Sequence, residues 1–80
     1  MAELRVYVNP PGASLAGGQG VFYSRRAHGP FYRWHYEEAA DVWRSSRVRL
    51  SDLTLRSLSS ANWQNVPDTL QAMLGKHYLD

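Results

Sequence analysis

The feature that most constrains this fold is a pair of short aromatic segments separated by a turn. Residues 21–26 (VFYSRR) and 31–38 (FYRWHYEE) are rich in aromatic and β-branched residues, the types favoured in β-strands. The four residues between them, Ala27-His28-Gly29-Pro30, have the composition and length of a hairpin turn. The sequence therefore predicts a β-hairpin over residues 21–38.

A four-residue loop would fix the register of this hairpin. It places Arg26 opposite Phe31 and Tyr23 opposite Trp34. Paired residues of an antiparallel ladder project from the same face of the sheet, so these pairs also define the two faces. One face is then nearly all aromatic and carries Val21, Tyr23, Arg25, Tyr32, Trp34 and Tyr36. The other face carries Phe22, Ser24, Arg26, Phe31, Arg33, His35 and Glu37.

Two segments flank the hairpin on its amino-terminal side. Leu4, Val6 and Val8 alternate with polar or aromatic residues, the period-two pattern of a half-buried strand. Residues 9–20 (NPPGASLAGGQG) contain four Gly and two Pro, so they cannot form a regular element. We expect a strand over 4–8, followed by a long flexible loop over 9–20.

A third strand of the meander is expected over residues 42–49, with two possible registers. A preceding loop of odd length places Val42, Arg44, Ser46 and Val48 on the aromatic face, whereas an even loop places Trp43, Ser45, Arg47 and Arg49 there. The even loop can set Glu37 opposite Arg44, a favourable cross-strand pair. The odd loop sets Arg33 against Arg47, which is repulsive, so the even loop is favoured.

The carboxy-terminal part ends in a helix. Residues 50–65 are ambiguous, since Leu53 and Leu55 alternate as in a strand, whereas Leu50, Leu53 and Leu58 could serve a short helix. Residues 67–78 suit a helix, because Pro67 can occupy the first position and one stripe is apolar, formed by Val66, Leu70, Met73, Leu74 and Tyr78. The prediction is a single α+β domain over residues 1–80, in which a small antiparallel β-meander sheet of three to five strands is packed on one face by the C-terminal α-helix.

Composition and motifs favour a non-enzymatic role. Eighty residues leave little room to enclose a substrate, and the absence of Cys excludes thiolate chemistry and Cys-ligated metals. Gly12 and Gly17 have P-loop spacing, but Gly18 and Gln19 follow them instead of Lys and Ser or Thr. The three His residues lack metal-ligand spacing. We therefore expect no catalytic residues, no cofactor and no metal.

The predicted sheet face opposite the aromatic one is the candidate interaction surface. Its residues combine exposed aromatic rings with cations, and they are Phe22, Arg26, Phe31, Arg33 and His35. Such a mixture is typical of protein interaction hot spots, so we expect the module to bind a protein partner or a second copy of itself. The alternative is single-stranded nucleic-acid binding on the same face, since bases stack on aromatic rings and phosphates attract Arg.

Charge and the amino terminus bear on partners and location. The net charge is only +2, but residues 25–49 hold six Arg against Glu37, Glu38 and Asp41, a local net charge of +3. The first twelve residues lack the basic and apolar regions of a secretory signal, and no apolar run approaches the roughly 20 residues of a membrane span. We expect a cytoplasmic protein without membrane contact.

The three tryptophans are expected in the core rather than on a ligand. Trp34 should pack beneath the C-terminal helix with its indole N–H satisfied at the core edge. Trp63, just before the helix, should close the small core.

Overall fold

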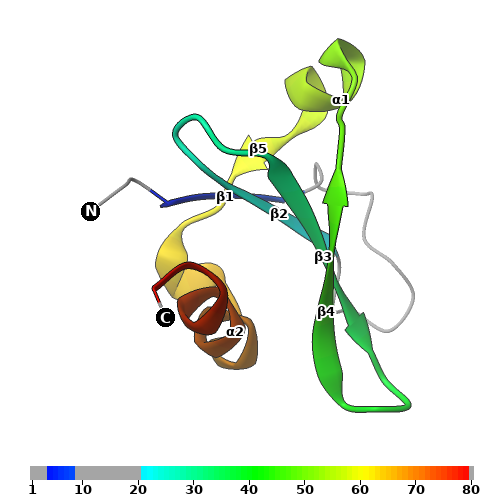
Figure 1. The fold of residues 1–80 in the computed structure, drawn as a ribbon, viewed down its shortest axis with the longest axis vertical. Coiled ribbons are helices and arrows are strands. Elements are labelled where there is room, and N and C mark those ends of the chain that lie inside the picture. Colours follow the sequence, from blue (N-terminus) through cyan, green and yellow to red (C-terminus); the bar gives the residue numbers. More distant parts are fainter. Residues whose placement is uncertain (1–3, 9–20, 80) are drawn as a thin grey trace.

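The computed structural model describes residues 4–8 and 21–79 and has the expected α+β architecture (Figure 1). The sheet elements are β1 (Leu4–Val8), β2 (Val21–Arg26), β3 (Phe31–Glu37), β4 (Val42–Val48) and β5 (Ser59–Ser60). The helical elements are α1 (Asp52–Ser57), the short 3₁₀ helix η1 (Trp63–Asn65) and α2 (Asp68–Leu79). All strand pairs are antiparallel, in the order β4-β3-β2-β1-β5. The predicted loop over residues 9–20 lies outside the described residues.

The β2–β3 hairpin forms, but the predicted register is wrong by one residue. Phe22 lies opposite Trp34, and Ser24 lies opposite Tyr32. The reason is the turn, in which the Gly29 amide donates to the carbonyl of Arg26 at 3.0 Å. This hydrogen bond makes the loop one residue shorter than expected. A shift of one residue in the register changes which side chains of β2 and β3 share a face of the sheet.

The corrected register divides the sheet into two faces. The helix face, which α2 covers, consists of Leu4, Val6, Val8, Phe22, Ser24, Arg26, Tyr32, Trp34, Tyr36, Trp43, Ser45 and Arg47. The outer face consists of Arg5, Tyr7, Val21, Tyr23, Arg25, Phe31, Arg33, His35, Glu37, Val42, Arg44, Ser46 and Val48. The residues of the predicted aromatic face are therefore divided between the helix face and the outer face.

The β3–β4 connection has the even length that the charges favoured. Glu37 lies opposite Val42, which leaves a four-residue turn. The prediction that Glu37 lies directly opposite Arg44 is wrong, because Arg44 lies opposite His35. The two side chains still form an ion pair, diagonally across the strands. Asp41 closes this turn with a φ of 53°, a left-handed conformation that Asp tolerates better than most residues. Its carboxylate also accepts a hydrogen bond from the Tyr36 hydroxyl.

The segment that the sequence left unassigned forms short elements. Helix α1 begins at an N-cap, where the Ser51 hydroxyl accepts from the Thr54 amide at 3.2 Å. Strand β5 then pairs with β1. Among the residues that the structure describes, no helix is long and apolar enough to cross a membrane.

The core lies between the helix face and α2. Trp34, Leu70 and Leu74 are almost completely buried, as the helical stripe predicted, and α2 begins one residue after Pro67. Other buried members of this cluster are Val6, Phe22, Trp43 and Val66.

Trp63 does not close the core, contrary to the prediction, because its side chain remains 49% exposed. The backbone anchors η1 instead: the Trp63 carbonyl accepts from the Gln71 side chain at 2.8 Å and from the Val66 amide at 3.0 Å. Val66, which is 2% exposed, fills the core position beside it.

A buried polar network ties α2 to the sheet. The Trp34 indole donates to the Ser24 hydroxyl at 2.8 Å, and this hydroxyl shares a second hydrogen bond with the Tyr78 hydroxyl at 2.7 Å. The Trp43 indole donates to the Thr69 hydroxyl at 2.9 Å. Both buried indoles are therefore satisfied, as burial of a polar N–H requires.

Candidate interaction surface

The five residues of the predicted surface do not share one face. Phe31, Arg33 and His35 lie on the outer face, whereas Phe22 and Arg26 lie on the helix face. The one-residue register shift causes this separation, because it moves the even-numbered residues of β2 to the side of α2.

Phe22 and Arg26 have structural surroundings. Phe22 is 8% exposed and its ring meets Trp43 edge-on at 5.9 Å. The Arg26 guanidinium donates to the backbone carbonyl of Tyr78 and lies 5.4 Å from the centre of the Tyr78 ring. These two residues contribute to the core and to the end of α2, and the surface that remains is centred on Phe31.

Phe31 lies between two neighbours on the outer face. The guanidinium of Arg25 is 4.7 Å from the centre of the Phe31 ring, a cation–π distance, and the Tyr7 ring is 6.0 Å away at 52°. Arg25 is held in place because it donates to the carbonyls of Arg26 and Ala27 at 3.0 and 3.1 Å. The Phe31 ring is therefore already engaged by a fixed cation.

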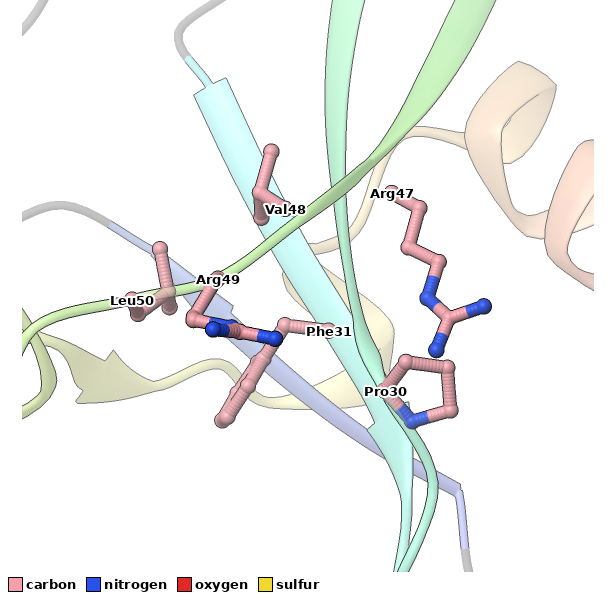
Figure 2. A pocket seen from close by; sticks show the side chains of 6 residues that line it. All are labelled: Pro30, Phe31, Arg47, Val48, Arg49 and Leu50. Carbon is pink, nitrogen blue, oxygen red and sulfur yellow. The ribbon is translucent and has the colours of Figure 1, made fainter.

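A hollow of about 520 Å³ opens beside Phe31 (Figure 2), and we call it the Phe31 hollow; its lining residues are Pro30, Phe31, Arg47, Val48, Arg49 and Leu50. Val48 lies directly opposite Phe31 in the β3–β4 ladder. In Figure 2, the Arg47 side chain extends towards Pro30, and the Arg49 side chain lies on the side of Phe31. An apolar floor is thus bordered by two cations.

Cations are unbalanced in this part of the sheet, both at the Phe31 hollow, which Arg47 and Arg49 line, and on the outer face, where Arg33 lies. Arg44 pairs with Glu37, whereas Arg33, Arg47 and Arg49 make no hydrogen bond or ion pair with any part of the chain that the structure describes. Arg47 and Arg49 are exposed, and Arg33 is half-buried. Three guanidinium groups are therefore available to an anionic ligand.

His35 is the third member of the predicted surface on the outer face. It lies opposite Arg44 and Val21 in the two ladders. Its Nδ1 atom is buried, and no group within 4–8 and 21–79 forms a hydrogen bond with it. The same residues contain no group of three or more His, Asp or Glu side chains that could hold a metal ion.

Sequence reasoning missed the β4 half of this surface. The sequence does contain a signal for this half, because cationic and apolar residues alternate over Arg47, Val48 and Arg49. It could not be used, because the register that places Val48 opposite Phe31 was not fixed. Three further exposed apolar side chains, Leu53, Leu55 and Trp63, belong to α1 and η1.

Comparison with known proteins adds no relative: no protein-family model matches the sequence, and no curated protein or solved structure is significantly similar to it.

Proposed function

We propose that this domain is a non-enzymatic interaction module that binds an acidic segment of a protein partner at the β4 side of the sheet. The binding residues are Phe31 and Arg33 on the outer face, together with Arg47 and Arg49, which line the Phe31 hollow. The observation that carries the proposal is the Phe31 hollow, in which an apolar floor is bordered by guanidinium groups that have no partner among residues 4–8 and 21–79. Aromatic and Arg side chains dominate the energetics of protein interfaces, and a carboxylate can accept two parallel hydrogen bonds from one guanidinium.

An acidic protein is favoured over single-stranded nucleic acid by the state of Phe31. Nonspecific binders of single strands offer open aromatic faces on which successive bases stack. Here the ring of Phe31 is engaged by Arg25 and Tyr7, and the neighbouring β4 side chains that line the hollow are aliphatic or cationic. This arrangement supports charge recognition with one apolar contact better than it supports a run of stacked bases.

The proposal is tested by selecting short peptides from a displayed random library against the purified domain. Fluorescently labelled single-stranded DNA and RNA of mixed sequence are titrated in parallel at low and moderate salt. We expect acid-rich peptides to be enriched, and the oligonucleotides to bind more weakly and lose affinity steeply as salt rises, since counterion release dominates such binding. Binding of oligonucleotides without enrichment of acidic peptides would overturn the proposal in favour of nucleic acid.

Variants locate the binding site on the domain. Arg33→Ala removes a free cation and Phe31→Ala removes the apolar floor, so each should weaken the selected peptides about tenfold or more. Arg56→Ala is the matched control, because Arg56 is an exposed cation on α1. Equal losses in Arg33→Ala and Arg56→Ala would show that binding depends on net charge and would contradict a defined site.

A further inference from the structure

Strand β4 is a long, regular edge of the sheet. It pairs with β3 through seven consecutive residues without a bulge, and it contains no proline. Within residues 4–8 and 21–79, no strand pairs with its other side. The four central residues, Arg44 to Arg47, are exposed. Because every second residue of an edge strand directs its backbone N–H and C=O away from the sheet, β4 can accept a further strand.

The opposite edge of the sheet is very different. Strand β5 consists of only two residues, Ser59 and Ser60, and a very short edge strand is a common protection against unwanted pairing. Strand addition to this sheet is therefore expected at β4.

The charges of β4 oppose pairing with a second copy. The segment carries Arg44, which pairs with Glu37 of β3, and Arg47, but it contains no acidic residue of its own. A two-fold antiparallel pair centred on Ser45 places Arg44 diagonally across from its own copy, and one centred on Ser46 does the same for Arg47. A pair centred on Arg44 or on Arg47 sets that arginine directly opposite its own copy. Each register brings like charges together, which destabilises cross-strand pairs.

We infer that β4 binds an extended, acidic segment of the partner protein as a sixth, antiparallel strand. The inference rests on the proposed function, since it assumes an acidic protein ligand and adds how that ligand is held. Main-chain hydrogen bonds to β4 supply affinity, and the side chains of β4 select the sequence.

The register of β4 specifies the pattern of this segment. Residues opposite Arg47 and Arg44 are acidic and stand three apart, so that their carboxylates lie on different faces of the sheet. The residue opposite Val48 is apolar, because Val48 lies beside Phe31 and lines the Phe31 hollow. The residue opposite Val42 is also apolar, and those between are small and polar.

A designed peptide tests the inference directly. It has seven residues to match β4, with valine at both ends, glutamate at the second and fifth positions and threonine elsewhere. Binding to the full chain is measured by fluorescence anisotropy. We expect glutamine in place of both glutamates to weaken binding about tenfold or more, because charge-assisted hydrogen bonds are lost.

Backbone methylation separates strand addition from simple charge attraction. Two further peptides carry N-methyl groups on alternate residues, one on the odd positions and one on the even positions. Only every second N–H of an added strand points to its neighbour, so one of the two peptides should lose binding and the other should keep most of it. Equal behaviour of the two methylated peptides refutes strand addition, while the acidic-ligand proposal stands if the glutamine peptide is still weaker.

Charge reversal tests the register. Arg47→Glu should abolish binding of the glutamate peptide and restore binding when the second position of the peptide is lysine, whereas the matched control Arg56→Glu should change neither. Failure of lysine to restore binding contradicts the register. A stable dimer of the chain without peptide, dissociated by N-methylated β4 peptides, would assign the edge to a second copy instead. If no acidic peptide binds and none is selected from the library, the proposed function itself fails.

Discussion

Replacing Ser24 by Ala should destabilise the domain far more than the size of the change suggests. Ser24 is completely buried, and its hydroxyl oxygen is the partner of the Trp34 indole at 2.8 Å. Trp34 is itself only 1% exposed, so Ser24→Ala leaves a buried N–H without a partner or access to water. An unsatisfied buried donor costs about 1–3 kcal/mol.

The second hydrogen bond of Ser24 adds a smaller amount. The Tyr78 hydroxyl lies 2.7 Å from the Ser24 hydroxyl, but Tyr78 is only partly buried, so water can replace the lost partner. This bond contributes about 1 kcal/mol. We therefore expect Ser24→Ala to lower the free energy of unfolding by about 2–4 kcal/mol, a large part of the ~4–12 kcal/mol typical of a domain of this length.

Urea unfolding followed by tryptophan fluorescence measures this loss. The midpoint should fall while the slope stays unchanged, since the surface exposed on unfolding is the same. Tyr78→Phe is the control, because it removes the weaker bond and leaves the Trp34 indole paired with Ser24. A smaller loss in Ser24→Ala than in Tyr78→Phe would refute the reasoning that the buried indole dominates.

Three further predictions concern the helix end and one turn. The pKa of the Tyr78 hydroxyl is raised, mainly because the hydroxyl is buried. The hydrogen bond with Ser24 and the charge of Arg26 lower this pKa, and repulsion from Tyr32 raises it further. A raised folded-state pKa gives stability that is complete below the unfolded value and is lost as the pH rises through the folded value, so urea midpoints above pH 10 should fall less in Tyr78→Phe than in the native chain. Gly75→Ala should raise the free energy of unfolding by about 0.5–1 kcal/mol in the same urea assay, because a Cβ there meets nothing within 4 Å and Gly is a poor helix residue; a loss would contradict this. Asp41→Ala should lower the thermal midpoint more than Asp41→Asn does in calorimetry, because Asn tolerates the left-handed conformation at this position and can still accept from Tyr36; equal losses would show that the turn is not strained.

Much of the fold follows from local patterns in the sequence. Alternation over Leu4 to Val8 and the apolar stripe of α2 predicted a strand and a helix, and both are present. The even length of the β3–β4 loop was predicted from charge, because only the even loop was expected to bring Arg44 and Glu37 together as an ion pair. These features depend on residues within a few positions or on one adjacent strand.

The β2–β3 register could not be obtained in this way. Ala27 to Pro30 all have turn chemistry, so composition does not say whether three or four of them form the loop. The hydrogen bond from the Gly29 amide to Arg26 decides it, and both candidate registers would have left aromatic residues on each face. The helix face is selected by packing, since Phe22 and Trp34 fill the space below Leu70 and Leu74.

The surface predicted from the sequence and the surface proposed from the structure share only some residues. Phe31 and Arg33 were identified, but Arg47, Val48 and Arg49 join them only through the β3–β4 ladder. Phe22 and Arg26 were assigned to the same surface because the predicted hairpin was one residue out of register. To predict a surface formed by several strands, the register of every strand pair between them must be known. The apolar stripe of a helix can be predicted without any strand register.

The most direct test of the account is an NMR titration of the labelled domain with the acidic peptide. We predict that the largest amide shifts lie along β4, from Val42 to Val48, and at Phe31, with small changes in α2. Shifts centred instead on Leu53, Leu55 and Trp63, the exposed apolar side chains, would contradict the assignment of binding to the cationic surface around Phe31.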